Sequence, residues 1–255
     1  MNTGPHREEI MAIGSVATEV PVIPIPKERL LEEDGVPLET DWHRLEMNLL
    51  IESVTYYWRH RADYFVGGNM FIYYNEEHAR NVDYRGPDFF FVRDSQLNPS
   101  RPYWAVWLEN YKFPNLIIEL TSPSTAEIDR VIKKDIYEKI FKTNNYFIFD
   151  PADNHLEGWH LENGSYVELQ PDERGWLWCD ELGLWLGNWY GKFQGKLNTY
   201  LRLFDKEGNL VPLFSEAAEL AEKAAAADRQ RADALEAELA KLKAQVGQAR
   251  KNGQN

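Results

Sequence analysis

The chain has 255 residues, 44% of them hydrophobic and 13% aromatic, which suits one well-packed domain with an appendage. A formal net charge of -13 at pH 7 repels polyanions, which excludes tight non-specific binding of nucleic acid through the field of the whole protein. No apolar run approaches a membrane span, and the lone Cys179 has no disulfide or metal-ligand partner, so we expect a cytoplasmic protein with no membrane partner.

The first 40 residues contain several prolines among mixed residues, and they predict an extended N-terminal arm. Apolar residues then recur at helical spacing from Asp41 to about Arg61, which predicts a helix with Asp41 as its N-cap. Strand signals follow from Tyr64 to Tyr74, interrupted at Gly67 and Gly68 as a bulge or bend would be. The domain is therefore expected to begin with a helix and a strand.

Two further strand-like runs each carry an acidic residue. Asp88 stands in G-P-D-F-F-F-V, and Glu119 stands in N-L-I-I-E-L-T-S-P-S-T within the run Leu116–Leu120. An ionised carboxylate beside an apolar strand costs several kcal/mol unless it is paired or bound to a metal. Asp88 and Glu119 therefore predict a shared divalent cation, Mg²⁺ or Mn²⁺, held on neighbouring strands.

A second helix is expected to open at Thr125, with Ser124 or Thr125 as its cap. The helix carries Lys133, fourteen residues after Glu119. A period of 3.6 residues predicts that its inner side is apolar, formed by Ile128, Val131, Ile132, Ile136 and Ile140.

A short strand at 146–149 completes an α-β-β-β-α-β order. Turn signals at Asn163-Gly164, Gly175, Gly183 and Gly187 then predict two or three hairpins between 156 and 189. Tryptophans 176, 178, 185 and 189 in these hairpins are interpreted as packing residues rather than base-stacking ones.

The C-terminal segment 215–250 is rich in Ala, Glu, Lys and Leu and has no proline. Leu235, Leu239, Leu242 and Val246 follow a 3-4 spacing, which predicts a coiled-coil helix that joins copies of the chain. A single solvated helix is the alternative. We therefore divide the chain into an arm (1–40), a domain (41–214), a coiled-coil helix (215–250) and a disordered end (251–255), and expect the domain to fold without the tail.

The motifs P-D-F-F-F-V, I-I-E-L-T-S-P-S-T, D-x-x-x-K-x-x-x-Y and Y-F-I-F-D-P resemble the Uma-two family within the PD-(D/E)XK restriction-endonuclease-like superfamily. The third motif consists of Asp129, Lys133 and Tyr137. The resemblance covers roughly residues 40–190. It implies an α/β (α+β) restriction-endonuclease-like fold, a mixed sheet with an αβββαβ core and added hairpins, and a metal-dependent phosphodiesterase site.

The chain departs from the superfamily pattern at one place. The parent motif has a lysine two residues after the second acid, where this chain has Thr121. The family resemblance assigns that role to Lys133, because Asp129, Lys133 and Tyr137 share one stripe of the helix; Lys134 lies about a hundred degrees away. The catalytic candidates are thus Asp88, Glu119 and Lys133, with Asp88 and Glu119 as metal ligands.

The superfamily often places an acid on the first helix, so His43 and Glu46, or Glu39 just before it, are candidates for a further metal ligand or a group that supports the ligands. The first functional hypothesis is an endonuclease that cleaves nucleic acid, DNA in particular, and binds it weakly without metal. A backbone carbonyl near Leu120 would complete the metal site. A catalytically silent, oligomeric scaffold with the same fold is the second hypothesis, and a phosphoesterase acting on RNA or a small substrate is the third.

Overall fold

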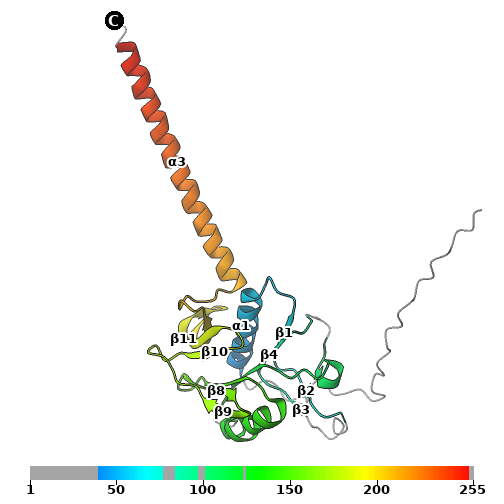
Figure 1. Ribbon diagram of the computed structural model, residues 1–255. Helices are drawn as coiled ribbons and strands as arrows, with labels where there is room; N and C mark the ends of the chain where they lie inside the picture. The colour runs from blue at the N-terminus through cyan, green and yellow to red at the C-terminus, as the bar shows by residue number, and fades with distance from the viewer. Residues whose placement is uncertain (1–39, 77–83, 97–100, 123–124, 253–255) are drawn as a thin grey trace, which may run out of the picture. The chain divides into compact units, whose positions relative to one another are not determined.

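A computed structural model describes residues 40–76, 84–96, 101–122 and 125–252, with side chains to Lys243 and at Gln245 (Figure 1). The predictions for 1–39, for Ser124 and for 253–255 lie outside the described residues. Within the described part of the chain, no helix is long and apolar enough to cross a membrane.

The first helix, α1, spans Asp41–Tyr57. Thr40, and not Asp41, is the N-cap: its backbone is extended and its hydroxyl accepts a hydrogen bond from the backbone N–H of His43. Asp41 is the first helical residue, where a carboxylate is favoured by the partial positive charge of the helix start. The helix therefore begins where the sequence predicts, with the cap one residue earlier.

The central sheet has six strands in the order β1-β4-β6-β7-β8-β9. The pair β6–β7 is parallel and all other pairs are antiparallel, so the sheet is mixed. The fold is thus the predicted α+β class with the αβββαβ core and a C-terminal helix. The bounds are β1 Tyr64–Gly67, β4 Phe89–Arg93, β6 Leu116–Leu120, β7 Asn145–Asp150, β8 His155–Glu162 and β9 Ser165–Glu168.

Two smaller sheets have the orders β3-β2-β5 and β10-β11-β12. The hairpin β8–β9 turns at the predicted Asn163-Gly164, whereas Gly187 lies inside β11 and is not a turn residue. The ring of Trp176 occupies the space that a Cβ at Gly187 would need, which explains the glycine. The bounds are β2 Ile72–Tyr73, β3 Tyr84–Arg85, β5 Trp104–Ala105, β10 Leu177–Cys179, β11 Leu184–Phe193 and β12 Lys196–Phe204, with a 3₁₀ turn, η2, at Val106–Leu108.

The central sheet is buried on both faces. On one face, Phe89 and Phe91 of β4 pack with α1 and the β10–β12 sheet. On the other, Phe90 and Val92 pack with β2, β5 and the helix that joins β6 to β7. A strand buried on both faces reads as a continuous apolar run, as β4 does.

The helix between β6 and β7 contains two stretches of π-helix, η3 (Ile128–Lys133) and η4 (Tyr137–Phe141), separated by a short α-helical part, α2 (Lys134–Ile136). Its buried side chains are Asp129, Tyr137 and Phe141. The predicted inner side is wrong for four of five residues, because Ile128, Val131, Ile132 and Ile140 are exposed. Thr125 does not cap the helix through its side chain; its hydroxyl accepts from the N–H of Ser122.

Residues four apart drift by about 40° around an α-helix of 3.6 residues per turn. The wider π-helical turns reduce this drift, so Asp129, Lys133, Tyr137 and Phe141 stay on one side. The inner face therefore has a four-residue period, which a search for the α-helical period does not find.

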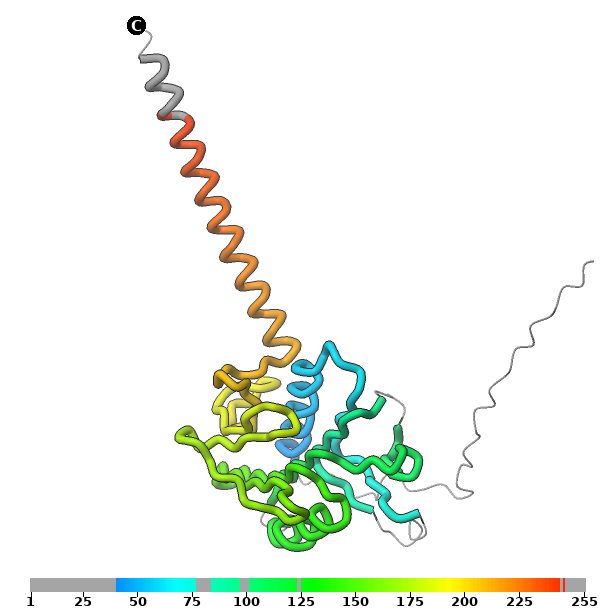
Figure 2. The backbone as a smooth tube through the Cα atoms, viewed as in Figure 1, coloured from blue at the N-terminus to red at the C-terminus, as the bar shows by residue number. Residues whose placement is uncertain are grey.

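The last helix, α3, spans Phe214–Asn252, and its colour in Figure 2 runs from orange to red. It continues two residues beyond the predicted coiled-coil segment. Cys179 is a free, buried cysteine that packs in the core, as expected. The tryptophans pack on neighbouring rings, with Trp176 stacked on Phe204 at 3.8 Å and Trp178 edge-on to Trp185 at 5.1 Å between ring centroids.

Candidate active site

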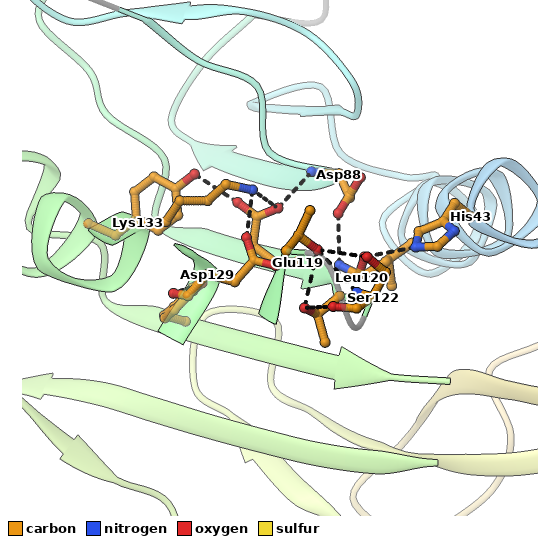
Figure 3. Close-up of polar contacts among 11 residues, drawn as sticks. His43, Asp88, Glu119, Leu120, Ser122, Asp129 and Lys133 are labelled. Carbon is orange, nitrogen blue, oxygen red and sulfur yellow. Dashed lines mark hydrogen bonds and ion pairs between the residues drawn. The ribbon is translucent and has the colours of Figure 1, made fainter. Parts of the chain in front are cut away.

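Asp88 and Glu119 lie side by side at one end of the pair β4–β6. The register of this antiparallel pair matches Phe89 with Ile118, so Asp88 and Glu119 are the next residues along each chain (Figure 3). The backbone N–H of Asp88 lies 3.4 Å from Glu119 Oε2, and the N–H of Leu120 donates to Asp88 Oδ2 at 2.8 Å. The two acids predicted to share a site are on neighbouring strands.

Strand alternation places both carboxylates on the same face of the sheet. Asp88 precedes Phe90 by two residues and Glu119 follows Ile117 by two, and Phe90 and Ile117 both belong to the core on the helix-covered face. Glu119 is fully buried, whereas Asp88 is half-buried at the strand start. The site is therefore more exposed at Asp88, before the start of β4, than at Glu119 on β6.

Gly68 permits the close approach of the chain to Asp88. A Cβ at Gly68 would lie 2.3 Å from the carbonyl oxygen of Asp88 and 2.6 Å from Met47. The sequence indicated only a bulge or a bend at Gly67 and Gly68, and the close approach at Gly68 is seen only in the structure.

The joining helix turns three polar side chains toward Glu119. Lys133 Nζ lies 3.0 Å from Glu119 Oε2 and 2.8 Å from Asp129 Oδ1, and the Tyr137 hydroxyl donates to Glu119 Oε1 at 2.8 Å. Lys134 instead lies over the ring of Trp159, at 3.9 Å from its centroid. Of the two adjacent lysines, Lys133 is the one that reaches the acids (Figure 3).

The electrostatics of the site follow from burial. Burial raises the pKa of Glu119 to about 8, against the opposing ammonium of Lys133, and Asp88 and Asp129 add to the rise. Burial also raises the pKa of Asp88, again opposed by Lys133. Desolvation is thus a larger cause of the raised pKa values than repulsion between the acids.

For Lys133, the neighbouring carboxylates together have a larger effect on the pKa than burial has. Burial disfavours its ammonium, but the carboxylates of Glu119 and Asp129 outweigh that cost and raise the pKa of Lys133 above its usual range. Its side chain is 21% exposed, so Lys133 is only partly shielded from solvent. Lys133 is therefore a fixed cation at neutral pH and not a proton acceptor.

The structure distinguishes between the candidates proposed for the first helix. His43 Nε2 donates to the carbonyl oxygen of Leu120 at 3.0 Å, because a carbonyl can only accept, and His43 Nδ1 lies 2.7 Å from the hydroxyl of Thr40. Glu46 is fully buried against β12, where it accepts from the N–H of Leu201. Glu39 lies outside the described residues. Only His43 of the described pair contacts the strand that carries Glu119.

The donor set fits a hard divalent cation. Mg²⁺ is commonly held by one or two carboxylates, with water and substrate oxygens completing its shell. Asp88, half-buried, and Glu119, fully buried, supply two such carboxylates at one end of the pair β4–β6. Among the described residues no three His, Cys, Asp or Glu side chains converge as a complete metal cage. The arrangement thus suits a cation that shares its coordination with substrate.

Comparison with known proteins supports the family suggested by the motifs. No curated protein matches the chain. A crystal structure described as a putative nuclease from Anabaena variabilis is similar at 10% identity and a TM-score of 0.42, over 57% of this chain and 76% of that one, which is too distant to carry an argument about the site. The profile of the Uma2 family, described as "Putative restriction endonuclease", matches residues 32–189. Because that match covers well over half of the sequence and includes both strand acids and the lysine-bearing helix, the chain belongs to the Uma2 family.

Proposed function

We propose that this protein is a metal-dependent endonuclease that hydrolyses phosphodiester bonds of DNA. The observation that carries the proposal is the convergence of Asp88, Glu119 and Lys133 from three separate elements, with Lys133 Nζ 3.0 Å from Glu119 Oε2. A packed core gains little from collecting two buried acids and a lysine, since each charge is costly to desolvate. A hydrolytic site needs all three.

Asp88 and Glu119 would hold Mg²⁺ or Mn²⁺, with the carbonyl oxygen of Leu120 as a further hard donor beside them. When bound, the cation supplies the Lewis acid that such hydrolysis requires. Leu120 is oriented by two contacts, since its N–H donates to Asp88 and its carbonyl accepts from His43. His43 is thereby a positioning residue for this end of β6.

Lys133 would act as a donor and a positive charge. Its raised pKa keeps it protonated, so it would orient the attacking water through an N–H and offset the negative charge that develops on the phosphate. Asp129 and Tyr137 would position it, Asp129 by pairing with its ammonium and Tyr137 by holding the other oxygen of Glu119.

The proposed enzyme acts in a reducing compartment, as its lone buried Cys179 suggests. It binds nucleic acid weakly until metal neutralises the acids, because its net charge is -13. Its body is the segment 41–214, and copies of the chain associate through α3.

The test uses purified full-length protein with plasmid DNA and Mg²⁺ or Mn²⁺. We expect cleavage by the wild type and loss of at least about 100-fold for Asp88→Asn, Glu119→Gln and Lys133→Met, by analogy with removal of one transition-state donor elsewhere. The two carboxylate variants should also lose metal-dependent thermal stabilisation, whereas Lys133→Met should keep it.

Lys134→Met is the matched control, because Lys134 lies on the same helix but packs on Trp159. Its cleavage rate should equal that of the wild type. Cleavage at an unchanged rate in all three site variants would indicate a contaminating nuclease and reject the proposal.

A catalytically silent oligomeric scaffold is the second candidate. The observation that favours it is that both oxygens of Glu119 already contact groups of the chain, Oε1 the hydroxyl of Tyr137 and Oε2 the ammonium of Lys133. Groups of the chain itself thus balance the charge of Glu119 without a metal. Absence of both metal-dependent stabilisation and cleavage would favour this candidate.

A further inference from the structure

The helix α3 presents an apolar stripe to solvent. We define the α3 seam as Ala232, Leu235, Leu239 and Leu242, whose three- and four-residue spacings are those of core positions a and d in a coiled coil. The three leucines are 61%, 53% and 53% exposed in the single chain. A helix of this kind gains stability when a second helix covers its stripe.

The charges that flank the α3 seam specify the second helix. The seam places Leu235 and Leu242 at position d and Leu239 at position a. Two charged residues, Arg231 and Glu238, then occupy position g. Two others, Glu236 and Lys243, occupy position e. In a parallel, in-register pair, each g residue faces the e residue that lies five positions further along the other helix. Arg231 then faces Glu236, and Glu238 faces Lys243, so all four charges meet an opposite charge.

In the single chain, Arg231 contacts Asp228 at 3.1 Å, and their side chains are 78% and 73% exposed. Exposed ion pairs of this kind contribute little to stability. Arg231 therefore loses little stabilisation when it leaves Asp228 and pairs with Glu236 of a second copy.

The base of α3 is fixed to the globular part. Arg202 is fully buried and donates to Glu216 at 2.7 Å, and Glu216 also accepts from the N–H of Leu213 at 2.8 Å. The N–H of Phe214 donates to Glu52 of α1 at 3.0 Å. The seam thus belongs to an element that is attached through several contacts rather than through a flexible linker.

We propose that α3 forms a two-stranded, parallel, in-register coiled coil with α3 of a second copy, held by the α3 seam and by the pairs Arg231–Glu236 and Glu238–Lys243. This deepens the association proposed above and is independent of nuclease activity. The partner is a second copy because the helix is complementary to itself in charge in this register, and each leucine of the α3 seam then meets its own counterpart. Both globular parts then lie at the same end of the coil.

Sedimentation equilibrium of the full-length protein, without metal or DNA, tests the pairing. We expect the wild type to dimerise, Arg231→Glu to weaken dimerisation at least about tenfold, and Arg231→Glu combined with Glu236→Arg to restore it. Arg229→Glu is the matched control: it makes the same change of charge at an e position that faces Ala224, and it should leave the dissociation constant unchanged. A monomeric or trimeric wild type, or equal effects of the two charge reversals, would overturn the proposal.

Leu242→Cys tests the orientation. In a parallel in-register pair the two Leu242 positions face each other, so oxidation should link the copies by a disulfide at a yield that falls with Arg231→Glu. An antiparallel pair places Leu242 opposite residues nearer the start of α3. A dimer by mass that does not cross-link would reject the parallel arrangement while leaving the nuclease proposal untouched.

Discussion

Glu119 shows how a single buried carboxylate governs this site. It has no exposed surface, its nearest cation is Lys133, and its pKa is raised to about 8 chiefly by burial. A raised pKa means that the folded chain holds a proton which the unfolded chain has released. The metal-free fold is thus more compatible with the neutral acid than with the carboxylate.

The sign of this linkage predicts how stability changes with pH. Between the unfolded pKa of about 4.3 and the folded value of about 8, the folded state binds more protons than the unfolded state, so the free energy of unfolding contributed by Glu119 falls as pH rises, by at most about 1.4 kcal/mol per pH unit. Glu119→Gln should flatten this slope. Urea unfolding in EDTA at several pH values measures it, and equal slopes in the two proteins would contradict the assignment.

At the scale of elements, the helix between β6 and β7 reverses the usual amphipathic pattern. Its inner side holds Asp129, Lys133 and Tyr137, whereas Val131 and Ile132 are 60% and 52% exposed. The polar inner side is stabilised by mutual ion pairs and by Glu119, so its burial does not leave charges unpaired.

This reversal predicts an unusual stability pattern. Val131→Ala and Ile132→Ala should each change the free energy of unfolding by no more than about 0.5 kcal/mol, since these side chains are exposed. Phe141→Ala, on the same helix but 3% exposed, should cost about 3–5 kcal/mol. Chemical denaturation measures the free energy of unfolding of the three variants. Comparable decreases at all three positions would show that the side of the helix with Val131 and Ile132 packs inward.

Sequence reasoning located the strands that carry the acids, because β6 and the start of β4 are apolar runs bounded by turn residues. Strand periodicity also indicated Asp88 and Glu119, whereas Lys133 came from the family resemblance, because the α-helical period favoured the apolar residues on the other side of its helix. It missed β3 and β5, which have two residues each and no pattern to detect. The contact between Gly68 and Asp88 depends on chain segments that only the tertiary fold brings together.

The strand β12 was missed for a different reason. It contains Arg202, which is fully buried, and a charged residue in a strand argues against burial unless its partner is known. That partner is Glu216 of α3, fourteen residues later. A pairing of this kind is not visible in hydropathy.

At the scale of the whole molecule, the same pair determines where the tail can be removed. A chain ending after Ala218 keeps Glu216 and should unfold at the temperature of the full-length protein. A chain ending after Phe214 leaves Arg202 buried without its carboxylate and should lose about 3–5 kcal/mol. Thermal denaturation of the two truncated proteins compares them directly.

Both truncations leave the charge of the body almost unchanged, because the seven acidic and seven basic residues from Ser215 onward cancel. A difference in unfolding temperature would therefore not arise from net charge. Equal unfolding temperatures would show that Arg202 finds another partner.

The contact between Asp88 and Leu120 has a consequence for folding specificity. The run Phe89–Val92 is apolar on both faces, so hydrophobic alternation does not distinguish the native pairing with β6 from one shifted by a residue. Polar contacts at the two ends of the pair make that distinction, Asp88 accepting from Leu120 at one end and Asn115 accepting from the N–H of Arg93 at the other. A shift by one residue would break both and send the two acids to opposite faces. The carboxylate proposed to hold metal thus also selects the one strand alignment that brings the two acids together, so a misaligned chain would lack the proposed site.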